Sequence, residues 1–445
     1  MTFDELVKIV KACGVAGAGG AGFPSYAKLD KKIDTVILNC AECEPLFKMH
    51  RQLLEKNAYE IITALDEIRQ IVGAEQFIVA VKKKYTKTVE AVNSVLGDYE
   101  CGKLSCLPEV YPMGDEVVLI YETTKRRVPA GNIPLSVGVC VFNVETVLNI
   151  YNAIHKNEPV THKYVTIAGE VKKPATFCVP LGTSFKELIK LAGGKTDENA
   201  VVINGGPMTG KLATEYDVVT KTTNGVLLFP ENHPVVMKRK AKTSVSAARA
   251  RSVCCQCGMC TDLCPRNLLG LPVDPTAFMD AVANGATYKA KAVADAIYCV
   301  SCGLCEMYSC TQGLNPRSLI DEFKIKMREN GIAPKKHEEA GAVKMSRDYR
   351  QVPMKRLMER IDLVRYDKSA EIKSTEVKPK RVKIMLSQTI GAPSVPCVKT
   401  GDIVEKGQKI ADANNGLSVP LHSSVDGKVA DVTDKFIIID RRGEK

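Results

Sequence analysis

Eight cysteines of the chain fall into two runs of similar spacing. The first run, CCQCGMCTDLCP, has the pattern C-x2-C-x2-C-x3-C and ends before a proline, and the second, CVSCGLCEMYSC, has the pattern C-x2-C-x2-C-x4-C. Three thiolates at two-residue gaps let one tight loop wrap three corners of an iron–sulfur cubane, and a fourth thiolate closes it. The spacing therefore predicts two [4Fe–4S] clusters with the candidate ligands Cys254, Cys257, Cys260, Cys264, Cys299, Cys302, Cys305 and Cys310.

The spacing also predicts which cysteines share a cluster. In bacterial ferredoxins with the spacing of the first run, the fourth cysteine binds the other cluster. By that rule Cys310 completes the first run and Cys264 completes the second. Two zinc sites or buried, unreactive cysteines are the alternatives, but zinc usually takes paired C-x2-C knuckles with a longer gap between them. Cys255 could take the place of Cys254, although Cys254 keeps the register.

Composition sets limits on the class of protein. The chain has 445 residues, a net charge of +11 and 17 cysteines, and no apolar run approaches the ~18–20 residues of a membrane span. Asp4 and Glu5 do not suit a signal peptide, so we expect a cytoplasmic protein with no transmembrane segment and no disulfide framework. Basic residues gather at 238–251 and 335–383 without a nucleic-acid recognition motif. We interpret them as a solvated linker or as a docking face for an acidic redox partner, with no nucleic acid bound.

A glycine-rich stretch near the start, GVAGAGGAGFP at residues 14–24, is the second feature that could do chemistry. Glycine lets backbone N–H groups approach a phosphate without a Cβ in the way, and such a loop before a helix forms an anion cradle. A mobile turn is the other reading of this stretch alone. It does not follow a clear strand, so the usual dinucleotide-binding fingerprint is not satisfied.

The elements around these motifs predict several domains. Residues 35–40 and 76–82 are short apolar runs typical of buried parallel strands, and residues 50–72 between them have a helical period, which indicates a doubly wound α/β domain. Residues 160–230 predict strands around one helix, capped by Ser184 or Thr183, as in a β-grasp fold. The last segment returns to strands and turns, as in a small barrel or sandwich.

Four stretches in order, GAGGAGFPSYAKL, VILNCAECEP, YPMGDE and FNVETVLNI, resemble the flavin-bearing, NADH-oxidising subunit of respiratory complex I. The resemblance implies bound FMN. It departs at Ala18, which stands where the family has an arginine, and the complex I protein has one cluster in place of two. By residue, it implies contacts to the FMN phosphate and ribityl chain from Gly17, Gly19, Gly20 and Lys28, contacts to the flavin from Asn39 and Glu42, contacts to NADH from Phe23 and Glu44, and further cofactor contacts from Gly114, Asp115, Glu116, Asn143 and Thr146.

Each of these pieces also has a plainer interpretation. Glu42 and Glu44 could be a solvated strand end, and Asn143 could simply cap a helix. Together and in family order, however, the four stretches favour a flavin site.

The order of the segments resembles RnfC-type electron transport proteins and, because the barrel-sandwich unit comes last, the PduS-type cobalamin reductases. The predicted fold is multidomain α/β and α+β. Its parts are a Rossmann-like FMN and NADH domain at 1–158, a β-grasp (SLBB-type) domain at 159–232, a ferredoxin-like helical dicluster domain at 245–332, a linker at 333–380 and an all-β barrel-sandwich domain at 381–445.

This resemblance implies an NADH-dependent reductase that passes electrons through FMN and two [4Fe–4S] clusters to cobalamin or a redox protein. It further implies an adenosyltransferase partner and a place in the cytoplasm or in a bacterial microcompartment. No catalytic acid or nucleophile is expected. Two alternatives stay open: an RnfC-like electron-input subunit of a ferredoxin:NAD oxidoreductase complex, and a non-enzymatic electron-transfer adaptor.

Overall fold

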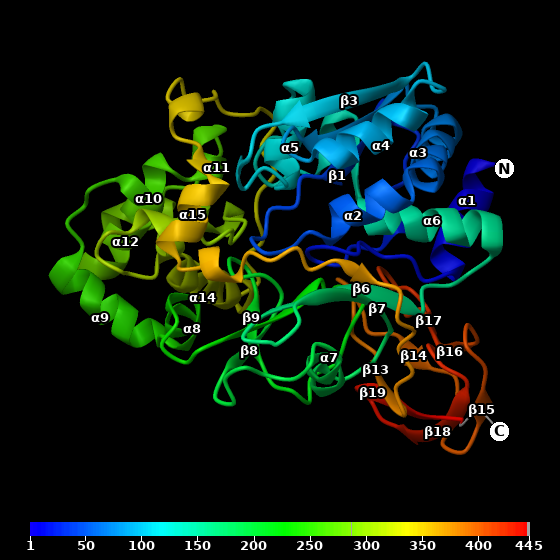
Figure 1. Cartoon of the computed structure of the whole chain (residues 1–445). Helices are drawn as coiled ribbons and strands as arrows, with labels where there is room; N and C mark the ends of the chain where they lie inside the picture. The colour runs from blue at the N-terminus through cyan, green and yellow to red at the C-terminus, as the bar shows by residue number, and fades with distance from the viewer. Residues whose placement is uncertain (286, 443–445) are drawn as a thin grey trace.

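The computed structural model describes residues 1–285 and 287–442, which form four domains and one connecting segment (Figure 1). The N-terminal domain and the helical domain lie side by side, with the β-grasp and C-terminal domains below them in this view. Among the described residues, no helix is both long and apolar enough to cross a membrane.

The N-terminal domain is a parallel sheet with helices on both faces, as the sequence predicted. Strand order is β3-β2-β1-β5, so the order reverses at β1. Helices α1, α3, α4 and α6 contribute to the hydrophobic core on one face, and α5 covers the other. The elements are α1 (Phe3–Ala12), η1 (Ser25–Lys28), β1 (Thr35–Cys40), α2 (Met49–Lys56), α3 (Ala58–Val72), β2 (Gln76–Lys82), α4 (Thr86–Leu96), β3 (Gly102–Leu107), β4 (Val110–Tyr111), α5 (Glu116–Thr124), η2 (Pro134–Val137), β5 (Val139–Asn143) and α6 (Val144–Lys156).

The helical period over residues 50–72 corresponds to two helices, α2 and α3, which meet at Asn57. The Asn57 side chain donates to the Leu53 carbonyl (2.9 Å) and its backbone leaves the helical region at φ −129°. Asparagine side chains compete with the helix for backbone partners, which explains why a break that periodicity does not reveal occurs here.

The β-grasp domain is a mixed sheet of order β12-β7-β6-β10-β8-β9 with one helix, α7. Ser184 caps α7 by accepting from Glu187 N–H, which confirms one of the two predicted caps. The elements are β6 (His162–Gly169), β7 (Ala175–Pro180), α7 (Phe185–Leu191), β8 (Val201–Asn204), β9 (Lys211–Ala213) and β10 (Gly225–Phe229).

The helical domain contains both cysteine runs. Helix α12 packs against α9 and α14 around a small core that includes Phe278, Met279 and Ile320. The elements are α8 (Pro234–Lys240), α9 (Thr243–Val253), α10 (Met259–Asp262), α11 (Pro265–Leu268), α12 (Pro275–Asn284), η3 (Thr287–Lys289), α13 (Ala290–Asp295), η4 (Ala296–Tyr298), the π-helical turn η5 (Cys305–Ser309) and α14 (Pro316–Glu329).

The expected linker 333–380 does more than connect two domains. Its strand β11 pairs with β4 of the N-terminal domain, and β12 adds an edge to the β-grasp sheet. Apolar residues of α15, such as Leu357, are buried in a core shared with the helical and β-grasp domains, and this burial holds the segment in place. The elements are η6 (Arg347–Tyr349), β11 (Val352–Pro353), α15 (Met354–Arg360), η7 (Val364–Tyr366) and β12 (Ile372–Lys373).

The C-terminal domain consists of two small sheets, of order β13-β19-β18-β15 and β14-β16-β17, as predicted for a barrel-sandwich. Its strands are β13 (Arg381–Met385), β14 (Val395–Pro396), β15 (Ile403–Val404), β16 (Lys409–Asp412), β17 (Leu421–His422), β18 (Gly427–Val432) and β19 (Phe436–Arg441).

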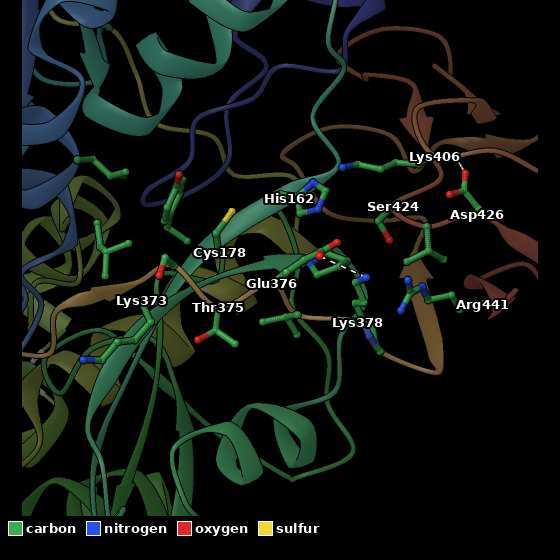
Figure 2. Close-up of a pocket in the computed structure, with 18 of the residues that line it drawn as sticks. His162, Cys178, Lys373, Thr375, Glu376, Lys378, Lys406, Ser424, Asp426 and Arg441 are labelled. Carbon is green, nitrogen blue, oxygen red and sulfur yellow. Dashed lines mark hydrogen bonds and ion pairs between the residues drawn. The ribbon is translucent and has the colours of Figure 1, made fainter. Parts of the chain in front are cut away.

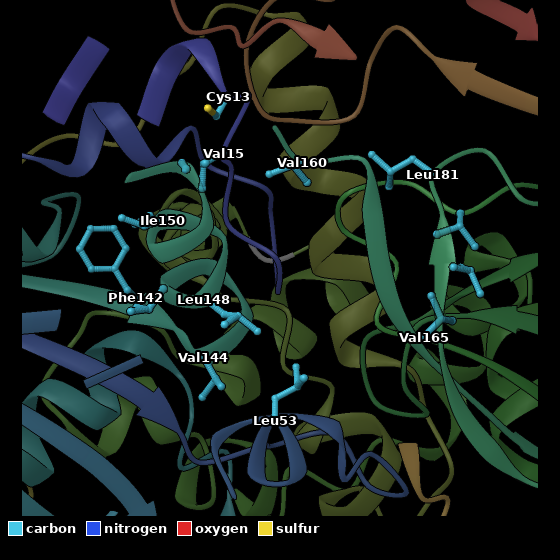
Figure 3. Packing of buried hydrophobic residues seen from close by; sticks show 14 of the residues in the cluster. Cys13, Val15, Leu53, Phe142, Val144, Leu148, Ile150, Val160, Val165 and Leu181 are labelled. Carbon is cyan, nitrogen blue, oxygen red and sulfur yellow. The ribbon is translucent and has the colours of Figure 1, made fainter. Parts of the chain in front are cut away.

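One hydrophobic core runs through three of the domains. Figure 3 shows Val15, Leu53 and Val144 of the N-terminal domain converging toward Val165 and Leu181 of the β-grasp domain. The same cluster continues into β13, β16 and β19. Because this core is continuous, the loops at the domain borders are held in fixed relation to one another.

Candidate flavin and iron–sulfur sites

The candidate flavin residues come together at the carboxyl edge of the parallel sheet, where β1 and β5 adjoin. Asn39 and Asn143 are partners in the strand register. The Asn39 side chain donates to Gly114 carbonyl (3.0 Å), and a Cβ on Gly114 would lie 3.4 Å from Asn39 Oδ1. In open α/β sheets, ligands bind at this edge where the strand order reverses, so the fold places these residues where a ligand is expected.

The glycine-rich loop lies against this edge. Ala18 N–H donates to Thr146 Oγ1 (2.9 Å), and a Cβ on Gly19 would lie 3.1 Å from Asn143 Nδ2. Gly20 has a φ of +73°, and nothing lies within 4 Å of a Cβ built on it. The loop is closed at its base by Gly17 N–H, which donates to Phe23 carbonyl (2.9 Å). Open space beside a bare backbone fits a phosphate-bearing ligand.

Lys28 and Asp115 lie on either side of Glu116, at the N-terminal end of α5. Lys28 Nζ donates to Glu116 Oε1 (3.2 Å) and to Val141 carbonyl (2.9 Å). Asp115 caps α5 by accepting from two backbone N–H groups, and its second oxygen accepts from Arg266 Nη2 (2.8 Å). Arg266 follows the cysteine run of the helical domain, so this ion pair joins the two candidate sites.

Glu42 lies in a buried polar group that sequence analysis identified only in part. It has a φ of +30°, and its Oε1 accepts from His50 N–H (2.8 Å). Burial raises the pKa of Glu42, and the Arg51 guanidinium, with Nε 3.3 Å from Oε2, opposes that shift. Within the described part of the chain, Glu42 Oε2, His50 Nε2 and Arg51 Nε are buried without a hydrogen-bond partner. Buried polar atoms that lack partners fit a site built for a polar ligand.

Glu44, expected to contact NADH, faces the β-grasp domain. Its carboxylate accepts from Met208 N–H (2.9 Å) and Thr209 N–H (2.8 Å), and also from the Thr209 hydroxyl. A Cβ on Gly206 would lie 2.1 Å from Glu44 Oε2, so only glycine fits there. Glu44 therefore holds the loop of the β-grasp domain against the candidate flavin site.

The C-terminal domain covers the outside of the glycine-rich loop. Ile390 N–H donates to Gly22 carbonyl (3.3 Å). The buried Lys221 donates from Nζ to Gly14 carbonyl (2.6 Å) and to Pro420 carbonyl (3.3 Å). Burial lowers the pKa of Lys221 to about 7. Three domains thus meet at this loop, which the sequence alone did not indicate.

Both cysteine runs form loops of the same backbone shape. Two left-handed residues alternate with cysteines in each loop: Gln256 (φ +54°) and Gly258 (φ +79°) in the first, and Ser301 (φ +59°) and Gly303 (φ +78°) in the second. Successive backbone N–H groups in such a conformation form a concavity for anions. Ser301 N–H already donates to Cys299 Sγ (3.3 Å). The loops therefore suit an anionic cluster.

The thiols gather in the crossed pairing that the ferredoxin rule predicts. Burial raises the pKa of Cys260 to about 11, and the neighbouring thiols of Cys310, Cys254 and Cys257 add to the shift; these four also line one small pocket. Burial likewise raises the pKa of Cys305, and the thiols of Cys299, Cys302 and Cys264 raise it further. In the described chain, no three metal-ligating side chains converge as around a single ion. Four thiols around a larger volume fit a cubane, in which each thiolate binds its own iron.

The second group of cysteines lies against the N-terminal domain. The Tyr111 hydroxyl donates to Cys302 carbonyl, and Arg266, two residues after Cys264, pairs with Asp115. The first group lies farther out, where Cys257 is exposed. Sequence analysis missed Tyr111 and Arg266, as well as His50, because their roles depend on contacts between distant segments.

A second hollow of about 520 Å³ lies between the end of α2, the β-grasp sheet and the C-terminal domain (Figure 2). Its lining is rich in exposed lysines such as Lys406, and one ion pair, Lys378 with Glu376 (3.3 Å), lies on its rim. None of the predicted site residues, all of which the structure describes, lines this hollow.

Comparison with known families assigns each domain. Residues 10–152 match the Nuo51 FMN-binding domain, residues 164–212 the SLBB domain, residues 253–315 the 4Fe-4S dicluster domain, and residues 364–442 the RnfC barrel sandwich hybrid domain. The FMN-binding and 4Fe-4S domains identify the chain as an oxidoreductase that uses FMN and iron–sulfur clusters.

Comparison with whole proteins covers nearly the full chain. The cobalamin reductase PduS of Citrobacter freundii is 38% identical over 97% of this chain and 95% of its own length, and that of Salmonella typhimurium is 38% identical over 99% and 97%. The RnfC-type component of the Na(+)-translocating ferredoxin:NAD(+) oxidoreductase complex of Acetobacterium woodii is 34% identical over 61% of this chain and 60% of its own.

Among solved structures, a chain of the NAD+-reducing [NiFe]-hydrogenase in the H2-reduced state superposes with a TM-score of 0.50 at 18% identity, covering 76% of this chain and 64% of that one, and so shares the fold. The near-complete coverage at 38% identity, together with the same four domains, settles the family: the chain belongs to the PduS cobalamin reductases.

Proposed function

We propose that this chain oxidises NADH and reduces cobalamin. The observation that carries the proposal is the junction between the two candidate sites: Asp115 at the flavin edge pairs with Arg266, and Tyr111 binds the carbonyl of Cys302. A single chain therefore holds a flavin site directly against a cluster site. The likeness to cobalamin reductases over the whole chain supports cobalamin as the acceptor.

We assign the cofactor residues as follows. The glycine-rich loop and Lys28 would hold the FMN phosphate and ribityl chain, and the strand-end residues would contact the flavin ring. One cluster would be bound by Cys254, Cys257, Cys260 and Cys310, and the other by Cys264, Cys299, Cys302 and Cys305. When bound, FMN supplies two-electron chemistry with a nicotinamide and the clusters supply one-electron transfer.

The protein contributes geometry and polarity to this chemistry. The buried ion pair of Asp115 (5% exposed side chain) and Arg266 (14%) fixes the spacing between the sites. Glu44 clamps the β-grasp loop over the same edge through two backbone N–H groups. Together these contacts exclude water from the space between the flavin edge and the nearer cysteine group.

An adenosyltransferase is the partner that we propose would consume the product, because reduced cobalamin is the nucleophile that accepts an adenosyl group. We further propose that the chain works in the cytoplasm, inside a microcompartment when one is present. The resemblance to PduS proteins supports both proposals.

The test uses the full chain, reconstituted anaerobically with FMN, iron and sulfide. NADH alone should bleach the flavin absorption, and added hydroxocobalamin should then be reduced in repeated turnovers. Cys302→Ala should still bleach with NADH but should lose cobalamin reduction, whereas Cys178→Ala, at a cysteine without cluster spacing, should behave as the wild type. Flavin that bleaches only with a reduced partner protein would show an adaptor and contradict the proposal.

One observation favours a protein acceptor as a second candidate. The basic stretch 238–251 lies on α8 and α9, directly before the exposed Cys255 and Cys257, and no acidic residue occurs between Glu231 and Asp262. An acidic ferredoxin could dock there. Turnover with ferredoxin and none with cobalamin would favour the RnfC-like function.

A further inference from the structure

We propose that His50 donates a hydrogen bond from Nε2 to an uncharged acceptor of the bound flavin, which is a ring carbonyl, a ring nitrogen or a ribityl hydroxyl. This inference rests on the proposed FMN site and adds a residue to it. His50 lies in the first turn of α2, is 8% exposed, and belongs to no motif that identified the other residues.

The position of His50 is fixed by two of the candidate flavin residues. Its backbone N–H donates to Glu42 Oε1 (2.8 Å). Its ring Nδ1 lies 3.4 Å from the side-chain nitrogen Nδ2 of Asn143. That same nitrogen lies 3.1 Å from the place of a Cβ on Gly19 in the glycine-rich loop. The imidazole is therefore part of the wall of the candidate flavin site.

The hydrogen-bond pattern determines which ring nitrogen carries the proton. Asn143 caps α6, and its Oδ1 accepts from Glu145 N–H (3.0 Å), so its NH2 group must be the end that faces His50. An amide NH2 only donates, and Nδ1 of His50 must therefore accept. A neutral imidazole then carries its hydrogen on Nε2, which makes Nε2 a donor.

This donor has no protein partner. Nε2 of His50 is buried and makes no hydrogen bond to any residue that the structure describes. A buried N–H group without an acceptor costs free energy, and native proteins rarely leave one unpaired. An acceptor on a bound ligand resolves this cost at the place where three candidate flavin residues already meet.

The charge state of the ring favours an uncharged acceptor. Burial lowers the pKa of His50 to about 3, and the positive charge of the buried Lys163 lowers it further. Lys163 itself is held by Glu145 and by Asn224 Oδ1 (2.8 Å). A neutral donor suits a carbonyl, a ring nitrogen or a hydroxyl, whereas a phosphate would favour the protonated ring. The phosphate is expected at the glycine-rich loop.

Two substitutions separate the proposed role from a structural one. In His50→Gln, the amide nitrogen takes the place of Nε2, while in His50→Asn the amide reaches only as far as Nδ1 and can still contact Asn143. The experiment titrates flavin-free, full-length protein with FMN, follows flavin fluorescence, and then measures the midpoint potential of the bound flavin. We expect His50→Gln to bind within about threefold of the wild type. His50→Asn should bind about tenfold more weakly, equivalent to about 1.4 kcal/mol, with a shifted potential.

Equal FMN affinities for the two variants, or wild-type affinity in His50→Asn, would overturn the proposal. Iron content and thermal unfolding of the flavin-free proteins should match the wild type. If His50→Asn does not fold, the nitrogen NMR signals of histidine-labelled wild-type protein decide the matter: FMN should shift the Nε2 signal of His50, and an unchanged signal would refute the inference. A wild-type protein that takes up no FMN would instead refute the proposed function itself.

Discussion

The crossed pairing of the cysteines makes a prediction that iron counting can decide. Each cluster needs four thiolates, and two clusters contain about eight irons per chain. The structure places Cys264 with Cys302, and Cys310 with the first run. The double substitution Cys264→Ala/Cys302→Ala therefore removes two ligands from one cluster and should leave about four irons. Cys302→Ala/Cys310→Ala removes one ligand from each cluster and should leave almost none.

The alternative, in which each run holds its own cluster, predicts the reverse. Cys264→Ala/Cys302→Ala would then damage both clusters, and Cys302→Ala/Cys310→Ala would leave about four irons. The assay is iron and sulfide content after anaerobic reconstitution, with electron paramagnetic resonance of the reduced protein to identify the remaining cluster. Cys178→Ala is the matched control and should keep about eight irons. Reversed iron counts in the two double variants would refute the crossed pairing.

Three further predictions concern the contacts between domains. Because the pKa of Lys221 falls to about 7 on folding, the unfolded chain binds the extra proton above pH 7 and stability should rise with pH there; Lys221→Met should lose up to about 2 kcal/mol of that rise between pH 7 and 9, and parallel pH profiles in denaturation would contradict this. Gly20→Ala and Gly22→Ala both place alanine at positive φ, at a cost of about 1 kcal/mol, but only a Cβ on Gly22 meets a methyl group at 2.6 Å, so Gly22→Ala should melt lower in flavin-free protein and equal melting would count against the contact. Asp115→Asn keeps a helix cap but leaves the Arg266 charge buried, which should destabilise the protein by about 3 kcal/mol in chemical denaturation; wild-type stability would show that the ion pair does not stabilise the fold.

Sequence could predict the parts of both sites that are built locally. The cysteine runs indicated clusters because three of the ligands come from one short loop, and the structure adds the left-handed residues Gln256 and Ser301 that shape those loops. The strand and helix types of the N-terminal domain were confirmed, because the apolar runs and helical period are local signals. The break at Asn57 was missed, since a single side chain interrupts an otherwise regular period.

The remaining features depend on contacts between distant segments. Glu44 looked like a nicotinamide contact from its motif, yet its carboxylate is bound by a loop more than 160 positions later. His50 and Lys221 carried no motif at all, and their importance follows from burial and from the direction of their hydrogen bonds. The pairing of β11 and β12 with other domains was hidden in a segment whose composition is mostly polar.

Cofactor analysis of the anaerobically prepared chain, followed by one addition of NADH, tests the central claim most directly. We expect about one FMN and about eight irons per chain, no zinc, and prompt loss of the flavin absorption with NADH alone, followed by reduction of added hydroxocobalamin. Zinc in place of iron, or a flavin that NADH leaves oxidised, would contradict the account.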